Sequence, residues 1–332
     1  MMNLFQSIKL NKSALVISTL LPLVILIPLQ IGPAKPMLLA ERFWPGTGWV
    51  EIALLVVYSA WLTQLVLNAR STADYRKRYW LFFSLAFFAQ FTIGLTLDPR
   101  FLMSGELHLP VPALILSGPL YRGSGFFMLI LLLSTIVVSG PGWCSHLCYI
   151  GAWDFAASAS KRKPAKINRN IIPGIRYFML GFAVVLPIIL NFSNVPGIVA
   201  FWAALTFGLA GVAVMAVLST KSGYMVHCTS YCPIGGFVAL LSRLYPLRLK
   251  IDQSTCDACL ACSSHCRYDA LNREDITSGR AGWNCTLCGD CLSVCARKSI
   301  SVKSCFGAGD VWPVYLAVVI GLHAAFIGLA RL

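Results

Sequence analysis

The chain has 332 residues, of which 57% are hydrophobic and 12% charged, and its formal net charge at pH 7 is +14. A composition this apolar excludes an ordinary soluble protein, because long stretches of the chain carry no charge for a solvated surface. The positive charge does not indicate nucleic-acid binding, since no basic helix or aromatic binding platform accompanies it.

Several apolar stretches come close to the roughly 20 residues that a helix needs to cross a bilayer. The predicted spans are Ala14 to Ile31, Trp49 to Leu67, Trp80 to Thr96, Phe126 to Ser139, Ile175 to Leu190, Ile198 to Leu218 and Val311 to Ala330. The first contains Pro22 and Pro28 and lacks a small-residue cleavage site, so we expect a retained helix rather than a cleaved signal peptide. The expected fold is a polytopic α-helical membrane protein of about seven spans.

Basic residues predict which side each loop occupies, because loops retained in the cytoplasm carry the excess of Lys and Arg. With the N-terminus inside, the basic residues fall on the cytoplasmic side except for Lys35, Arg42, Arg100, Arg122 and Arg331. All 13 cysteines fall on the cytoplasmic side too, where thiols stay reduced and can hold iron. The net charge then reflects this asymmetry, together with contacts to membrane lipid headgroups.

Two related segments follow the fourth and the sixth predicted spans, Cys144-x3-Cys148 and Cys228-x3-Cys232. This spacing puts both sulfurs of a pair on one face of a helical turn, so the two pairs could bring four thiolates to one site at the membrane surface. Inert buried cysteines are the plain alternative, but the repetition at equivalent positions disfavours it. The pattern leaves open a third metal cluster or a pair of redox-active dithiols.

Two four-cysteine runs of identical spacing come next, Cys256-x2-Cys259-x2-Cys262-x3-Cys266 and Cys285-x2-Cys288-x2-Cys291-x3-Cys295. A zinc ribbon could explain one Cys-x2-Cys pair but not two copies of a four-cysteine run. In the bacterial two-cluster arrangement, the last cysteine of each run ligates the other run's [4Fe-4S] cluster. The predicted ligand sets are Cys256, Cys259, Cys262 and Cys295 for one cluster, and Cys285, Cys288, Cys291 and Cys266 for the other.

The flanks of these runs, Leu247 to Asp252 and Ser299 to Lys303, alternate apolar and polar residues as paired short strands do. The predicted domains are therefore a membrane domain at 1–246 with six spans, an α+β ferredoxin-type domain at 247–304, and a C-terminal transmembrane helix at 305–332. No Gly-x-Gly-x-x-Gly, phosphate loop or Cys-x-x-Cys-His is present, so the sequence indicates neither nucleotide chemistry nor covalently attached haem.

The combination resembles the NapH, MauN and NosR type of membrane polyferredoxin over roughly residues 125 to 303. The resemblance rests on the two Cys-x3-Cys segments, which lie between spans and upstream of a double ferredoxin run. The second segment continues as Cys232-Pro233-x-Gly235. One departure is visible: a proline usually follows the fourth cysteine of each run, whereas Arg267 and Ala296 stand here.

The resemblance implies electron transfer at the bacterial inner membrane, by a carrier rather than a free-standing enzyme. The distribution of basic residues places the C-terminus in the periplasm. The carrier would relay electrons between cytoplasmic or quinol-pool donors and a partner redox enzyme that is periplasmic or membrane-bound. Two alternatives stay open. The chain could be a maturation or redox-regulatory factor for a partner metalloenzyme, acting through the Cys-x3-Cys pairs, or it could be the membrane component of a larger quinol dehydrogenase.

A quinone site would need ionisable residues within or beside spans, and the candidates are Glu106, His108 and His323. For His323 the alternative is a hydrogen-bonding role inside the helix bundle, and for the other two it is solvation or docking. The segment from Leu109 to Leu120 is apolar but too short and proline-rich to cross, so we expect it to lie in the interface or to re-enter. One hypothesis is that it covers a quinone pocket or forms a platform for a periplasmic partner.

Overall fold

The computed structural model describes residues 11–33, 36–69, 71–102, 109–161, 163–165, 171–307 and 309–329. These residues are mostly helical and contain one two-stranded sheet. The helices among them that are long and apolar enough to cross a membrane are α1 (Lys12–Ile31), α2 (Gly48–Leu67), α3 (Thr72–Thr96), the continuous stretch Phe127–Leu147, α7 (Ile172–Phe192) and the stretch Gly197–Ser222.

Three helices differ in length from the apolar stretches that predict them. α3 begins at Thr72 rather than Trp80, because the Ser71 side chain accepts a hydrogen bond from an N–H of the first turn and caps a segment too polar to be predicted as a span. α5 (Phe127–Ser139) continues through a 3-10 turn, η3 (Gly140–Gly142), and a π turn, η4 (Trp143–Leu147). α14 (Trp312–Gly328) has 17 residues and covers about 25 Å, less than a hydrocarbon core of roughly 30 Å.

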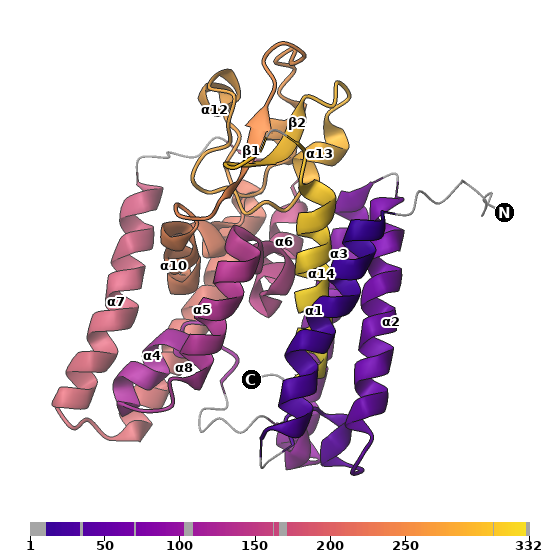
Figure 1. The fold of residues 1–332 in the computed structure, drawn as a ribbon. Helices are drawn as coiled ribbons and strands as arrows, with labels where there is room; N and C mark the ends of the chain where they lie inside the picture. The colour runs from indigo at the N-terminus through magenta and orange to yellow at the C-terminus, as the bar shows by residue number, and fades with distance from the viewer. Residues whose placement is uncertain are drawn as a thin grey trace. The chain divides into compact units, whose positions relative to one another are not determined.

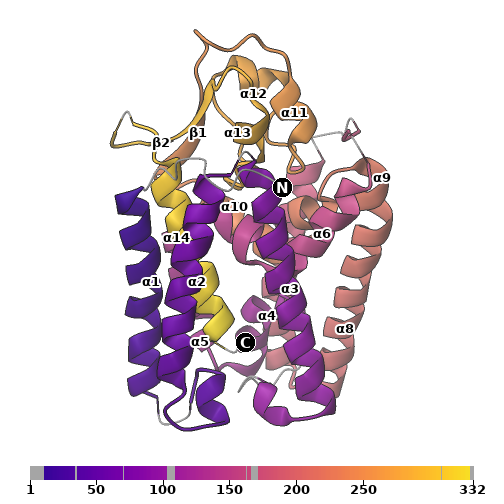
Figure 2. The same cartoon turned by 90° about the vertical axis from the view of Figure 1, so that its right-hand side faces the viewer.

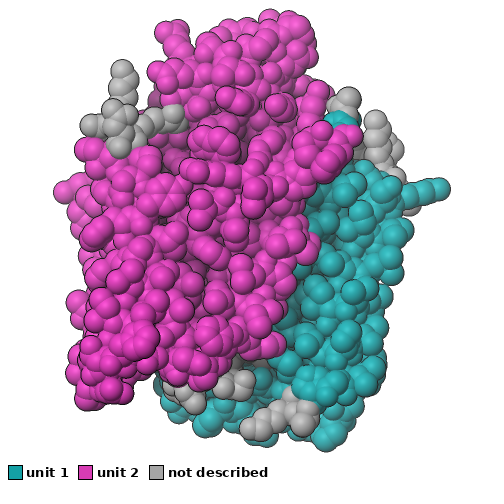
Figure 3. All heavy atoms as spheres, turned by 60° about the vertical axis from the view of Figure 1, so that its left-hand side comes forward, with its two compact units in different colours: residues 1–104, 307–332 teal, residues 105–306 magenta. Residues whose placement is uncertain are grey.

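The chain forms two compact units, residues 1–104 with 307–332 and residues 105–306, which Figure 3 shows in different colours. In unit 1, helices α1, α2, α3 and α14 lie lengthwise beside one another (Figures 1 and 2). Gly328, at the end of α14, packs against Leu26 in the last turns of α1 and against Leu55 in the first turns of α2. α14 therefore runs parallel to α1 and antiparallel to α2.

Unit 2 holds the other membrane-capable helices, among them α8 (Gly197–Ala213), which extends through η5 (Val214–Ser219) and α9 (Thr220–Ser222), and also the short helix α4 (Leu114–Arg122). α4 arises from the proline-rich segment and is a short helix that packs on α7. The Ser117 hydroxyl donates to the Ala183 carbonyl at 2.7 Å, and the Asn191 amide donates to the Tyr121 carbonyl at 2.6 Å. These bonds fix α4 against the middle and the end of α7.

The ferredoxin-type module belongs to unit 2 as well. β1 (Leu247–Ile251) pairs with β2 (Ile300–Ser304) in antiparallel fashion, which confirms the predicted strands with ends that differ by a single residue. The alternating side chains of the two strands form a small buried core, Leu249, Ile251, Ile300 and Val302. The short helices α11 (Ala261–His265), α12 (Arg273–Thr277) and α13 (Asp290–Val294) lie between the strands in sequence and beside the strand pair in Figure 2.

Candidate iron–sulfur sites

The two ferredoxin-type cysteine runs share one backbone design. Three pairs of equivalent residues adopt positive φ, and Gly289 is the one glycine among them. The pairs are Ala258 with Leu287, Leu260 with Gly289, and Asp269 with Lys298. Left-handed backbone is costly for residues with a Cβ, and it persists where the surroundings require it. Because the second cysteine of each run stands between two such residues, both runs curl into the same loop with their cysteines gathered on it.

The fourth cysteine of each run lies beside the other run. Burial raises the pKa of the Cys262 thiol, and the neighbouring Cys295 and Cys256 raise it further. Burial likewise raises the pKa of the Cys266 thiol to about 12, and Cys285 adds to this effect. Such thiols are protonated at neutral pH, so iron must supply the positive charge that makes them ligands.

The proximity of Cys266 to the second run and of Cys295 to the first is what the crossed ligand sets require. Among the described residues, no three His, Cys, Asp or Glu side chains converge on a single point as the ligands of one ion do. A cubane cluster is built differently, because each thiolate binds its own iron atom at a separate corner.

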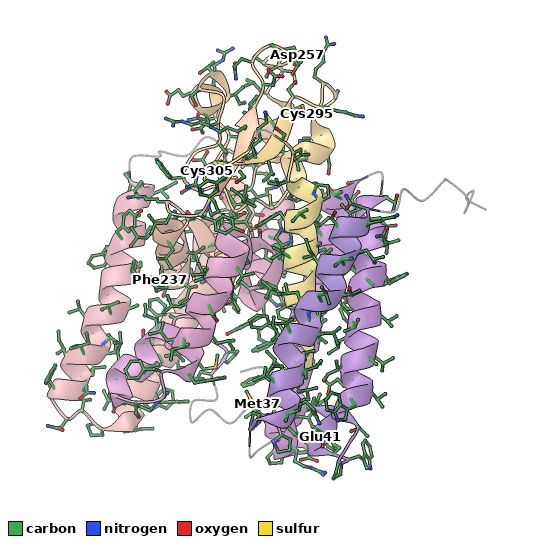
Figure 4. All side chains as sticks on the ribbon, in the orientation of Figure 1. Met37, Glu41, Phe237, Asp257, Cys295 and Cys305 are labelled. Atoms are coloured by element: carbon green, nitrogen blue, oxygen red, sulfur yellow. The ribbon has the colours of Figure 1, made fainter. Side chains whose placement is uncertain are left out.

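The two ferredoxin-type sets differ in their access to solvent. Cys259 of the first set is exposed, whereas Cys291 of the second is buried. An ion pair between Asp257 and Arg297, 3.4 Å apart, lies on the exposed side of the first set. Figure 4 shows Asp257 and Cys295 together at the end of unit 2 that is remote from Phe237 of α10 (Pro233–Leu241). The first set is therefore the one that a soluble protein can approach.

The two Cys-x3-Cys segments also repeat one design. Cys144 lies in the π turn η4 and Cys148 is the N-cap of α6 (Tyr149–Ala159), while Cys228 lies in the π turn η6 (His227–Tyr231) and Cys232 is the N-cap of α10. The backbone angles of the two N-caps are nearly equal, φ −75° and ψ 117° against φ −70° and ψ 119°. π turns are rare in proteins, and those that do occur are often found at functional sites.

Each N-cap sulfur faces the start of a helix. Backbone N–H groups of Ile150 and Gly151 point to the Cys148 sulfur, and they lower the pKa of a thiol that burial raises to about 12. The corresponding N–H groups of Ile234 and Gly235 act on Cys232 in the same way. A helix N-terminus favours an anion, so both positions suit a thiolate that binds metal.

The four cysteines form one group. The half-buried Cys228 lies close enough to Cys144, Cys148 and Cys232 to interact with each electrostatically, and burial raises its pKa well above the usual value. The buried carboxylate of Asp154 accepts hydrogen bonds from the Ser219 hydroxyl at 2.6 Å and from the Cys228 N–H at 2.9 Å. Sequence analysis did not single out Asp154, although an acidic residue in an otherwise apolar helix is a recognisable signal.

The segment between Cys144 and Cys148 of the four-cysteine group (Cys144, Cys148, Cys228 and Cys232) contacts the second ferredoxin-type run. The Ser145 hydroxyl donates to the Thr286 carbonyl at 3.0 Å, and His146 Nε2 lies 3.5 Å from the Leu287 carbonyl. Thr286 and Leu287 stand between Cys285 and Cys288. A small cavity of about 20 Å³ has Cys144, Cys228 and Cys285 in its lining. The second run is therefore the one nearest the four-cysteine group.

Arg267 explains the departure from proline after Cys266. Its guanidinium donates to the Gly223 carbonyl at 2.8 Å and to the Ser158 carbonyl at 3.2 Å, and its own carbonyl accepts from the Met225 N–H at 2.9 Å. Proline could make neither side-chain bond. Arg267 thus fastens the Cys266 segment to the last turn of α6 and to the segment that follows α9.

An apolar cavity of about 590 Å³ lies between α4, α7 and α8. Phe207 in its wall stacks on Tyr231, with ring centroids 4.8 Å apart, and the Tyr231 hydroxyl donates to the Phe207 carbonyl at 2.7 Å. The His227 ring lies 5.5 Å from the Tyr231 ring and directly precedes Cys228 in the chain. A short series of aromatic rings therefore joins the cavity to the four-cysteine group.

Of the three residues predicted as quinone-site candidates, His323 alone lies among the described residues. His323 is buried in unit 1, where its Nε2 lies 3.1 Å from the Tyr58 hydroxyl and its ring packs against Tyr79 and Phe83. Glu106 and His108 lie outside the described residues. The cavity beside the Leu109 to Leu120 segment is the one between α4, α7 and α8, and His323 is not part of its lining.

A protein-family model described as a 4Fe-4S binding domain matches residues 121–164 and 204–252. These two matched segments contain the Cys-x3-Cys pairs. The ferredoxin-type protein NapH of Haemophilus influenzae is 25% identical over 192 residues, which cover 53% of this chain and 67% of that protein. The resemblance to NapH-type polyferredoxins is confirmed.

The family match indicates 4Fe-4S cluster binding, and the described residues include helices long and apolar enough to cross a membrane. An uncharacterized protein of Methanocaldococcus jannaschii is 28% identical over 80 residues, a match that covers 24% of this chain and only 31% of the archaeal protein. No solved structure matches this chain.

Proposed function

We propose that this chain relays single electrons between a soluble redox partner or the quinol pool and a partner redox enzyme, which is periplasmic or membrane-bound. The observation that carries the proposal is the contact of Ser145 and His146 with Thr286 and Leu287, because it joins the four-cysteine group to the second ferredoxin-type run. The cysteine sets then form a series from an exposed end to the membrane helices. Iron–sulfur centres supply one-electron transfer at such positions.

The residues that would hold two [4Fe-4S] clusters are the crossed sets, Cys256, Cys259, Cys262 and Cys295 with Cys285, Cys288, Cys291 and Cys266. We propose that Cys144, Cys148, Cys228 and Cys232 hold a third iron–sulfur centre. Two features favour this over redox-active dithiols: the sulfurs of Cys148 and Cys232 face helix N-termini, and the 4Fe-4S family model matches the segments that contain both pairs.

The apolar cavity between α4, α7 and α8 is the proposed quinol site. Its volume of about 590 Å³ falls within the range of small-molecule pockets. The stacked rings of Phe207 and Tyr231 bring its wall toward Cys228. Oxidation of a hydroquinone there would release two electrons toward the cysteine sets and two protons to solvent-connected groups.

The proposed orientation has the N-terminus and the ferredoxin-type module in the cytoplasm and the C-terminus in the periplasm of a bacterial inner membrane. The parallel course of α1 and α14 supports it, since both helices then begin on one side and the module directly precedes α14. We expect alkaline phosphatase fused after Leu332 to be active and the same enzyme fused after Cys305 to be inactive. Activity of the Cys305 fusion would reverse the assignment.

The test of the function is the iron and acid-labile sulfide content of the anaerobically purified protein, with EPR of its reduced form. We expect the quadruple variant Cys144→Ser, Cys148→Ser, Cys228→Ser, Cys232→Ser to lose roughly four of about twelve irons per chain, because one cubane of three is removed. Cys305→Ser is the matched control, since Cys305 is exposed and belongs to none of the sets. About eight irons in both the wild type and the quadruple variant would instead support dithiols.

The same variant separates relay from maturation. Lost partner activity with normal partner cofactor content supports electron relay, whereas a cofactor-deficient partner would show that the chain acts in assembly.

A further inference from the structure

One buried cation stands between the four-cysteine group and the second ferredoxin-type run. Arg176, in α7, is 6% exposed. Its Nε donates to the Thr229 carbonyl at 2.6 Å, and its Nη1 donates to Asn284 Oδ1 at 2.8 Å. Thr229 directly follows Cys228, and Asn284 directly precedes Cys285. A single guanidinium therefore holds one loop of each cysteine set.

Among the described residues, no Asp or Glu carboxylate forms an ion pair with the Arg176 guanidinium. Its two hydrogen-bond acceptors, a carbonyl and a side-chain amide, are neutral. A buried charge without compensation is costly, so an anion is expected close by.

The anion available is the four-cysteine group itself. Arg176 lies close enough to Cys144, Cys228 and Cys232 to interact with them electrostatically, and it lines the small cavity that Cys144 and Cys285 also line. A cubane with four thiolate ligands carries a net negative charge that grows by one on reduction. A fixed cation at this place stabilises the reduced form more than the oxidised form, and burial strengthens the effect.

We propose that Arg176 is a positioning residue that raises the reduction potential of the four-cysteine centre and holds that centre against the second ferredoxin-type run. The inference rests on the proposed function, since it needs an iron–sulfur centre at Cys144, Cys148, Cys228 and Cys232. It adds a means by which the protein sets the order of potentials along the series. Arginine suits the role because its planar fork holds two acceptors while it keeps its charge.

The experiment is an EPR-monitored redox titration of the purified full-length protein as wild type, Arg176→Gln and Arg176→Lys. We expect the midpoint potential of the four-cysteine centre to shift lower in Arg176→Gln, and to shift less in Arg176→Lys, which keeps the charge. Arg243→Gln is the matched control. Arg243 is exposed and lies over Trp283 next to the same loop, where solvent screens its charge, so its removal should leave the potential unchanged.

An unchanged potential in an iron-replete Arg176→Gln protein would overturn the inference. Where Arg176→Gln fails to retain the iron of this centre, Arg176→Lys decides: retention of the iron supports a role for the charge, and its loss shows a role in packing alone. Failure of the proposed function looks different. In that case the wild type and the quadruple serine variant have equal iron contents, whatever residue stands at position 176.

Discussion

Replacement of Cys266 by serine should remove the cluster bound by the second cysteine run and leave the cluster of the first run intact. The physical reason is the crossed arrangement, in which Cys266 lies close to Cys285 and Cys291 of the second run. We expect roughly four irons fewer per chain, with one EPR signal lost. Because the second run contacts Ser145 and His146, electron transfer between a soluble reductant and the membrane centres should be abolished.

Double variants show which cysteines share a cluster. Cys266→Ser combined with Cys285→Ser should lose no more iron than either single variant, because both residues belong to one centre. Cys266→Ser combined with Cys259→Ser should lose two centres. The reverse pattern, with Cys266 and Cys259 equivalent, would exclude crossing. Cys305→Ser serves again as the control and should keep the full iron content.

Replacement of Cys295 should act at the opposite end of the series. Its loss removes the centre of the first run, which contains the exposed Cys259 and lies beside the surface ion pair of Asp257 and Arg297. We expect reduction by a soluble partner protein to fail while reduction of the membrane centres from the quinol side persists. This contrast between Cys266→Ser and Cys295→Ser is a direct test of the order of the sites.

Sequence patterns were informative where the chemistry is local. The spacing of the cysteine runs, the alternation at 247–252 and the apolar stretches each depend on neighbours within a few residues, and each has its counterpart in the loops, in the β1–β2 pair and in the helices. The repeated Cys-x3-Cys spacing also pointed to a paired site. It did not reveal the π turns, since the hydrogen bonds that distinguish a π turn from an α-helix leave no clear trace in composition.

The features that sequence analysis missed depend on contacts between distant residues. Arg176 meets Asn284 across more than a hundred residues, and Ser145 meets Thr286 across still more. Similarly, α14 packs with α1 and α2 from the far end of the chain. In the sequence, Arg176 has the pattern of a basic residue at the entry of a span, which orientation alone explains. Its burial between two cysteine sets is visible only once the helices are packed.

Filling the cavity between α4, α7 and α8 should slow the reduction of the iron–sulfur centres by quinol. Ala204→Trp adds a bulky indole to the cavity lining without a new charge, so quinol-dependent reduction of the iron–sulfur centres should fall by about tenfold or more, the cost of losing roughly 1.4 kcal/mol of binding. Chemical reduction by dithionite should be unaffected, because the cysteine sets are untouched. Stopped-flow absorbance with a water-soluble quinol measures both rates.

The matched control for this prediction is Ala213→Trp. Ala213 belongs to the same helix and is exposed, but it is not part of the cavity lining. It should therefore reproduce any general effect of an added tryptophan on α8 and leave quinol oxidation near the wild-type rate. Equal rates for the wild type and Ala204→Trp would separate the cavity from quinol chemistry. Electrons would then enter the chain at its exposed end, near Cys259, and the four-cysteine group would serve as the exit toward the partner enzyme.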